Sequence, residues 1–370
     1  MTKLNDLTAL GQAIWLDYIQ RSFLASGEMQ TLIDRGVRGM TSNPSIFEKA
    51  ITGSSDYDAD LESLISSGLS VEEIYEALAI DDIQNAADLL LPVFEISSGA
   101  DGYVSLEVNP NLAHDTEGTF IDAVRLWQAV DRPNLMIKIP ATEAGIPAIQ
   151  RAIGAGININ VTLIFSRERY AEVIEAYQSG LEGRLAAGQS MDHVASVASF
   201  FISRLDTKID QSLMNSLKRN PDLKHDVKPL LGQAAVANAK LAYQQFLSEF
   251  ASKRFEELAT QGAQVQRPLW ASTSTKNPAY SDILYIQELI GPRTVNTVPQ
   301  DTLDAFLDHG EVRVTIDDDL NRAQQSLDSM DYFGISLSKA TEELEIEGVN
   351  AFAKSFSSLL DSIAAKKRSL

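Results

Sequence analysis

Lys138 is the residue whose position most clearly suggests chemistry. It interrupts a short apolar run, Leu135 to Pro140, whose other residues are typical of a strand buried on both faces. A buried ammonium needs a partner or gives up its proton, and a neutral lysine amine attacks carbonyl carbons to form an imine. In the alternative interpretation Lys138 is structural, with its head extended to the strand end or paired with one carboxylate. The neighbouring polar residues have to decide between the two.

Further polar residues recur at the ends of the other apolar runs. If these runs form a barrel, the polar residues at their carboxyl ends meet at one mouth. The set then offers one amine nucleophile, two carboxylates able to transfer protons, and amide and hydroxyl groups able to orient a polyol. Its members are Asp17, Asn43, Glu107, Lys138, Asn160, Thr162, Ser199, Ser272 and Asn296.

The two carboxylates also have ordinary structural interpretations. Glu107, within Val104 to Val108, could be only the ion-pair partner of Lys138. Asp17 could equally cap the helix that follows its strand. Neither carboxylate identifies a catalytic site by itself, and their value as evidence comes from their occurrence with Lys138.

The amide and hydroxyl residues are also ambiguous one by one. Asn43 precedes Pro44, and taken alone it is better explained as a turn or N-cap residue. Asn160 and Thr162 alternate correctly to face one side of a strand, but threonine is an ordinary strand former. The functional interpretation therefore depends on the whole set.

The elements that must position these residues follow from the apolar pattern. Short runs rich in Val and Ile alternate with longer segments of helical period, which is typical of repeated βα units and a parallel sheet. The runs are Ala13 to Asp17, Val37 to Met40, Tyr103 to Val108, Leu135 to Pro140, Ile157 to Ile164, Val194 to Phe200, Pro268 to Ser272 and Thr294 to Val298. Their number predicts a closed (β/α)8 TIM barrel with catalytic groups at the carboxyl ends of the strands.

The rest of the chain is predicted to decorate that barrel with helices. We expect one domain over residues 1–370, with helical insertions at about 44–102 and 205–266 and a C-terminal helical extension at about 311–370. The terminal helix carries an apolar stripe that must cover another part of the molecule. The stripe consists of Val349, Phe352, Phe356, Leu359, Leu360 and Ile363.

Composition excludes several classes of function. Lys and Arg number 31 and Asp and Glu 51, so a net charge of −20 opposes binding to nucleic acid or anionic lipid, and an anionic ligand needs a local basic pocket. Cysteine is absent, the four histidines have no metal-ligand spacing, and no nucleotide-binding glycine motif occurs. We expect no metal and no cofactor. Without a signal peptide or a membrane span, the chain is expected to be cytoplasmic.

Five segments resemble one known family. Gly39 to Phe47 and Met136 to Ile146 are similar to the two signature segments of transaldolase, a Schiff-base enzyme of the pentose phosphate pathway. Val104 to Asp115, Gly156 to Ser166 and Asn296 to Pro299 are similar as well. The similarity runs through nearly the whole chain in consistent order, and it is greatest to the longer bacterial branch of the family.

The resemblance implies a mechanism. Lys138 would form the imine with a ketose phosphate (sedoheptulose 7-phosphate or fructose 6-phosphate) and keep a dihydroxyacetone unit for transfer to an aldose phosphate (glyceraldehyde 3-phosphate or erythrose 4-phosphate). Asp17 would be the acid-base group at the hydroxyl beside the breaking bond. Glu107 and Thr162 would hold the water that relays protons during imine formation and hydrolysis.

The resemblance also implies the residues that bind substrate. Asn43 and Asn160 would hydrogen-bond the sugar, and Ser199 and Arg204 match a substrate-contacting serine and a phosphate-binding arginine. Phe201 would lie on the pocket wall.

One segment departs from the family pattern. A second phosphate-binding arginine often follows the seventh strand, but Trp270 to Pro278 contains none. Ser272 matches the family, and either Ser274 or Lys276 would replace the guanidinium, with loss of a bidentate contact. Lys276 could equally be a solvated loop lysine.

Two other functions remain alternatives. A Schiff-base sugar-phosphate aldolase such as fructose 6-phosphate aldolase would release the three-carbon unit, but those relatives are shorter and resemble Gln and Tyr at the positions of Glu107 and Phe201. A non-catalytic sugar-phosphate-binding barrel would keep the fold without the chemistry. The sequence leaves the oligomeric state, monomer or homodimer, open.

Overall fold

Eight parallel strands close into a barrel in the computed structural model, which describes residues 2–369. Each strand pairs with the next in the chain, and β8 pairs with β1. The strands are β1 (Gln12–Asp17), β2 (Val37–Thr41), β3 (Val104–Glu107), β4 (Leu135–Pro140), β5 (Ile159–Ile164), β6 (Ser196–Phe201), β7 (Arg267–Ala271) and β8 (Thr294–Val298). The predicted (β/α)8 barrel is confirmed, and every strand boundary lies at most two residues from its predicted place.

Helices surround the barrel, with one helix before β1, at least one in each βα segment and further helices after β8. Before β3 these helices are α1 (Lys3–Ala9), α2 (Arg21–Ala25), α3 (Glu28–Arg35), α4 (Pro44–Gly53), α5 (Asp58–Ser66) and α6 (Val71–Ile96). Between β3 and β6 they are η1 (Pro110–Leu112), α7 (Thr116–Val130), α8 (Gly145–Gly154) and α9 (Arg167–Ala186). The remainder are α10 (Ser203–Arg219), η2 (Pro221–Leu223), α11 (Lys224–Val227), η3 (Lys228–Leu230), α12 (Ala234–Glu249), α13 (Lys253–Ala259), α14 (Leu284–Glu288), α15 (Gln300–His309), α16 (Leu320–Tyr332) and α17 (Leu337–Ser369).

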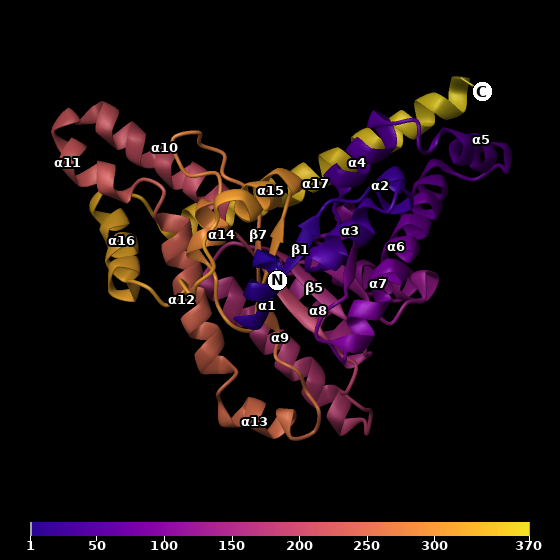
Figure 1. Ribbon diagram of the computed structural model, residues 1–370, viewed down its shortest axis with the longest axis horizontal. Helices are drawn as coiled ribbons and strands as arrows, with labels where there is room; N and C mark the ends of the chain where they lie inside the picture. The colour runs from indigo at the N-terminus through magenta and orange to yellow at the C-terminus, as the bar shows by residue number, and fades with distance from the viewer. Residues whose placement is uncertain (1, 370) are drawn as a thin grey trace.

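The long connections lie on opposite sides of the barrel. Helices α4, α5 and α6 connect β2 to β3, and α10 to α13 connect β6 to β7. Figure 1 shows α5 and α6 at the right and α10, α11 and α12 at the left, with α16 beside them. Local sequence sets the start of α6, because Ser70 caps the amide of Glu73 while the Glu73 carboxylate accepts from the amide of Ser70.

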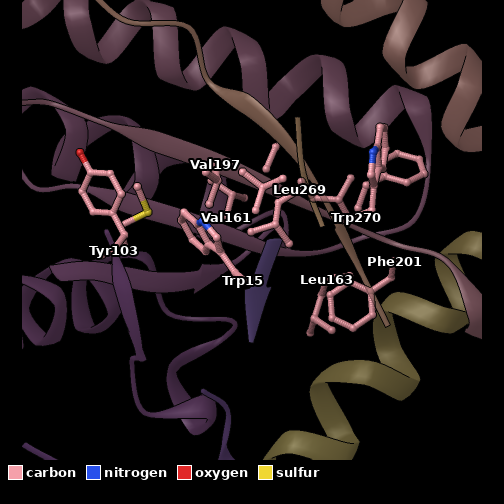
Figure 2. Packing of buried hydrophobic residues seen from close by; sticks show 14 of the residues in the cluster. Trp15, Tyr103, Val161, Leu163, Val197, Phe201, Leu269 and Trp270 are labelled. Atoms are coloured by element: carbon pink, nitrogen blue, oxygen red, sulfur yellow. The ribbon is translucent and has the colours of Figure 1, made fainter. Parts of the chain in front are cut away.

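The barrel interior is filled by side chains from alternate strand positions. Trp15 lies against β2, where Gly39 leaves room for the indole; a Cβ there would be 2.6 Å from the ring. Figure 2 shows Trp15, Val197 and Leu269 among the packed apolar side chains. The indole Nε1 donates to Asp101 Oδ1 at 3.2 Å. This packed interior fixes the strands whose carboxyl ends carry the site.

Helix α17 covers the mouth of the barrel. It packs along α4 and contacts β5 and α10, and in Figure 1 it is the yellow helix that runs beside α4. The stripe predicted from the sequence is the covered face, since Phe352 and Phe356 are each 4% exposed. Gly348 fits against Leu163, whose left-handed backbone (φ 59°) lies at an irregularity near the end of β5. Ion pairs from Arg169 to Glu345 and from Lys208 to Glu343 attach α17 to α9 and α10. None of the helices within residues 2–369 combines the length and apolar character needed to cross a membrane.

Candidate active site

A cavity of about 350 Å³ opens at the carboxyl ends of the strands. It is lined by most of the residues that the sequence nominated. These are Asp17, Asn43, Lys138, Thr162, Ser199, Phe201, Arg204, Ser272, Ser274 and Lys276. The strand ends, the start of α4, the start of α10 and the loop after β7 thus contribute to one site, as parallel strands in a closed barrel require.

Lys138 points into this cavity from β4. Its neighbours Ile137 and Ile139 point to the opposite face of the strand and are fully buried. The ammonium Nζ donates to the backbone oxygen of Ser42 at 3.1 Å and lies 5.7 Å from the ring centre of Phe352. Only 6% of the side chain is exposed. The amine is therefore held in one place, at the edge of a cavity that a small carbonyl compound can enter.

Glu107 lies beside Lys138 on the neighbouring strand. Its Oε2 is 3.5 Å from Lys138 Nζ, which is a charge contact rather than a short hydrogen bond. Burial raises the pKa of the Glu107 carboxyl to about 7, although the charge of Lys138 acts in the opposite direction. A carboxyl with this pKa can both give and take a proton near neutral pH.

Glu107 Oε2 and Thr162 Oγ1 are buried atoms without a hydrogen-bond partner among residues 2–369. Buried polar atoms in this state are uncommon in folded proteins. They provide hydrogen-bonding capacity for a small polar molecule close to Lys138.

Asp17 provides a second acid-base group at the end of β1. Its Oδ1 accepts from Thr41 Oγ1 at 2.8 Å, and Thr41 Oγ1 lies 2.7 Å from Thr297 Oγ1. Burial raises the pKa of the Asp17 carboxyl, whereas Lys138 and the Thr41 hydrogen bond lower it. The capping interpretation of Asp17 is wrong, because the N-cap of α2 is Gln20.

Asn43 is the N-cap residue that the sequence suggested, and it also lies at the cavity. It lines the cavity and is also the N-cap of α4, where its Oδ1 accepts from the amide of Ile46 at 3.0 Å. The cap places the start of α4, with Pro44 at its first position, beside the mouth of the barrel.

Asn160 is the register partner of Lys138 on β5 but is not among the residues that line the cavity. Its Nδ2 donates to Ser105 Oγ at 2.9 Å, and its Oδ1 accepts from Ser199 Oγ at 2.7 Å. Ser199 does line the cavity. Asn160 is fully buried, and its side-chain amide positions the hydroxyl of Ser199.

Three cations define one end of the cavity. Arg204 lies over the Phe201 ring at 5.3 Å, and Lys276 and the unpredicted Lys49 line the same cavity. Burial and the charge of Arg204 lower the pKa of Lys276, and Lys49 adds to the effect. Within residues 2–369 none of the three forms an ion pair with a carboxylate, in a chain whose net charge is −20. A cluster of positive charges without ion-pair partners favours an anionic ligand.

The loop after β7 brings both proposed replacements for the missing guanidinium to this end. Lys276 Nζ donates to Ser274 Oγ at 2.6 Å, and both residues line the cavity. Ser272 adopts a left-handed backbone conformation (φ 56°), and its Oγ lies 3.0 Å from Ser203 Oγ. The loop is thereby connected to the start of α10, which carries Arg204.

The placement of Asn296 at the mouth was wrong. Its neighbour Thr297 lines the cavity, so strand alternation directs Asn296 to the other face of β8. There its Oδ1 accepts from Thr273 Oγ1 at 3.0 Å.

Sequence reasoning missed other cavity residues, namely Thr41, Ser45, Ile46, Lys49, Ala271, Thr273, Thr297, Pro299 and Phe352. For Phe352 a signal existed, because the apolar stripe of the terminal helix had no assigned target. Figure 2 shows Phe201 and Leu163 beside the yellow ribbon of that helix, α17. Within the described residues no group of three or more His, Asp or Glu side chains is placed to hold a metal ion.

Comparison with known proteins gives consistent matches over the chain. A family model described as Transaldolase/Fructose-6-phosphate aldolase matches residues 14–363. A protein named Transaldolase from Mycolicibacterium smegmatis is 48% identical over 98% of this chain and 98% of its own length. A protein named Transaldolase from Trichodesmium erythraeum is 46% identical over 99% of this chain and 98% of its own length. A protein named Transaldolase 2 from Nostoc punctiforme is 46% identical over 98% of this chain and 97% of its own length.

Proposed function

The chain belongs to the transaldolase/fructose-6-phosphate aldolase family, and we propose that it performs the transaldolase reaction through an imine on Lys138. The reaction transfers a dihydroxyacetone unit from a ketose phosphate (sedoheptulose 7-phosphate or fructose 6-phosphate) to an aldose phosphate (glyceraldehyde 3-phosphate or erythrose 4-phosphate). The enzyme is a transferase, and relatives named transaldolase match it over nearly the full length. The observation that carries the proposed mechanism is the buried amine of Lys138 in a cavity that also contains Arg204, Lys276 and Lys49.

The first step is imine formation. The neutral amine of Lys138 attacks C2 of the ketose, and the resulting carbinolamine loses its C2 oxygen as water. A proton from the neutral Glu107 carboxyl completes that water, and Glu107 is left as a carboxylate. The pKa of Glu107 near 7 suits both this step and its reversal during hydrolysis. Thr162 Oγ1, which has no partner among residues 2–369, is available to hold the water.

Asp17 acts in the second step, the cleavage of the bond between C3 and C4. Its carboxylate removes the proton of the C4 hydroxyl, the aldose phosphate leaves, and the electron pair passes into the iminium. The acceptor aldehyde then adds to the same carbon, and Asp17 returns the proton to the new hydroxyl. The hydrogen bond from Thr41 orients the carboxylate for both directions.

Transfer instead of release requires that the three-carbon carbanion is not protonated. Phe201 supplies an apolar wall with no donor, and Phe352 covers Lys138 from α17. Poor access of acids to the carbanion favours transfer of the three-carbon unit. An aldolase would instead protonate the carbanion and release the unit.

The phosphate group of either substrate binds at the cationic end. Arg204 provides a guanidinium, and Lys276, held by Ser274, takes the place of the missing second arginine. Ser272 contributes a hydroxyl. Lys49 adds a further charge from α4. Asn43 and Ser199, the latter positioned by Asn160, bind hydroxyl groups of the sugar.

We further propose that the enzyme works in the cytoplasm on small sugar phosphates, in the pentose phosphate pathway. The absence of cysteine is compatible with any redox compartment, and the net charge of −20 disfavours nucleic acid and anionic membranes as partners.

The test is an assay of the purified protein with fructose 6-phosphate, first alone and then with erythrose 4-phosphate. Formation of sedoheptulose 7-phosphate and glyceraldehyde 3-phosphate only in the presence of the acceptor supports the proposal. Steady release of dihydroxyacetone without an acceptor would identify an aldolase, and no turnover in either assay would identify a non-catalytic barrel.

A further inference from the structure

A second cavity, of about 170 Å³, adjoins the active site at Glu107. Glu107 lines this second cavity, whereas Lys138 lines the first. Helices α6 and α7 and residue Phe356 of α17 form its walls. Glu107 thus links the two cavities by contact, because its Oε2 lies 3.5 Å from Nζ of Lys138, which lines the first.

The second cavity has a mixed lining, in which polar groups lie among apolar side chains such as Leu106, Leu126 and Phe356. Tyr75 also lines this cavity; burial raises the pKa of the Tyr75 hydroxyl, and the nearby charge of Glu107 adds to this effect. At the outer side Arg125, whose side chain is 48% exposed, pairs with Asp122 at 2.6 Å and also with Glu76. Asp122 is anchored by the amide of Asn109, which donates to its Oδ2 at 2.9 Å. A cavity of this size is large enough for water, and its polar groups supply hydrogen-bond partners for it.

The proposed reaction needs such a space. Imine formation breaks the C2–O bond of the ketose: the amine nitrogen forms a double bond to C2, and the oxygen leaves as water with a proton from Glu107. The sugar phosphate then fills the first cavity, and Phe352 lies over Lys138. If the water held at Glu107 and Thr162 exchanges with solvent while the sugar is bound, it needs a route that does not pass the sugar.

We propose that the second cavity is the path by which water and protons reach Glu107 from solvent while the sugar occupies the first cavity. This inference rests on the proposed imine chemistry. It assigns to Tyr75, and to the helix α6 wall that carries it, a positioning role for the water on which Glu107 acts.

The test follows the C2 oxygen of the ketose. Each imine cycle replaces this oxygen with one from solvent if the released water escapes, so enzyme and fructose 6-phosphate in H₂¹⁸O incorporate ¹⁸O at C2. Ala79 is 1% exposed and lines the second cavity, so Ala79→Leu fills it from the wall. Blocking the path is expected to lower ¹⁸O incorporation about tenfold, while the amount of imine trapped on Lys138 by borohydride stays the same.

Controls separate this effect from general damage. Ala77 lies on the same helix and lines neither cavity, so Ala77→Leu is expected to keep wild-type exchange. Lys138→Arg measures exchange without imine. Tyr75→Phe keeps the shape of the wall but removes its hydroxyl, and it is also expected to lower exchange. It provides the test if Ala79→Leu does not fold.

The outcomes are distinct. Wild-type exchange in Ala79→Leu, or in Tyr75→Phe when Ala79→Leu does not fold, would overturn the inference and leave the imine mechanism standing. A wild-type protein that forms no Lys138 adduct would instead overturn the proposed function.

Discussion

Glu107 Oε2 and Lys138 Nζ lie 3.5 Å apart on neighbouring strands, and their side chains are 5% and 6% exposed. The two residues are direct partners in the register of β3 and β4. A carboxyl and an amine placed this close, and shielded from solvent, can exchange protons with a common small molecule. This relationship links the nucleophile to the group that we propose handles the water.

The pH dependence of activity tests the role of Glu107. Because burial raises the pKa of this carboxyl to about 7, kcat/KM for the ketose is expected to show an ionisation near that pH. Glu107→Gln should remove the ionisation and lower kcat/KM by about 10²–10⁴-fold, the usual range for loss of a general acid-base group. The measurement is a pH series of both proteins between pH 5 and pH 9. The exposed Glu95 provides a control in Glu95→Gln, and an unchanged ionisation in Glu107→Gln would rule out this assignment.

Asp17 is expected to act after imine formation. Asp17→Asn preserves shape and the contact with Thr41 Oγ1, but it cannot accept the C4 hydroxyl proton. Borohydride reduction of this variant with fructose 6-phosphate should attach the intact six-carbon sugar phosphate to the protein, whereas the wild type should carry the three-carbon unit. Intact-protein mass spectrometry distinguishes the two adducts. A three-carbon adduct at the wild-type rate in Asp17→Asn would contradict the proposed role.

The cationic end of the cavity should determine the affinity for phosphate. Lys276→Met and Lys49→Met each remove a charge that has no carboxylate partner among residues 2–369, and KM for sugar phosphates is expected to rise about tenfold, or ~1.4 kcal/mol. Lys253→Met, at an exposed position on α13, makes the same change in net charge away from the cavity. Steady-state kinetics of the three variants provide the comparison. An equal effect of Lys253→Met would attribute the loss to net charge alone.

Ser274→Arg restores a guanidinium to the loop after β7. If Lys276 and Ser274 together replace a second arginine, this substitution in a Lys276→Met background should recover much of the lost affinity, because a guanidinium contacts phosphate in a bidentate manner. Failure to recover any affinity would place the phosphate elsewhere in the cavity.

Asp206 makes the stability of the fold depend on pH. Its carboxylate accepts from the amide of Ala235 at 2.7 Å and from the hydroxyl of Tyr285 at 2.9 Å, which fixes α10 near Arg204. Burial raises the pKa of Asp206 from 3.8 to about 7. Between these values the native state holds a proton that the unfolded state has lost, so this group lowers the free energy of unfolding as the pH rises from about 4 to about 7. Asp206→Asn should flatten that part of the curve, as measured by urea unfolding at several pH values, and an unchanged slope would contradict the assignment.

The barrel was predictable because each strand carries its own signal. Apolar runs such as Leu135 to Pro140 are short, rich in branched residues and separated by helical segments, so their number alone indicates a closed barrel. The catalytic residues could be predicted for the same reason, because Asp17, Glu107 and Lys138 lie at the ends of these strands. Their assigned chemistry came from the family resemblance.

The cavity residues that the sequence did not predict are brought there by contacts between segments distant in sequence. Lys49 is an exposed helix residue like many others, and only the fold brings it to the cavity that contains Arg204. Phe352 belonged to a recognised apolar stripe, but its contact with Lys138 spans most of the chain. Asn296 was misplaced because a strand end was considered without the alternation that Thr297 sets.

The site of covalent attachment tests the central claim most directly. The wild type is incubated with fructose 6-phosphate, reduced with borohydride, digested and mapped by tandem mass spectrometry. The cavity contains three lysines, so the experiment has internal alternatives. We expect the three-carbon adduct on Lys138 and none in Lys138→Arg; an adduct on Lys49 or Lys276, or no adduct at all in an active enzyme, would contradict the account.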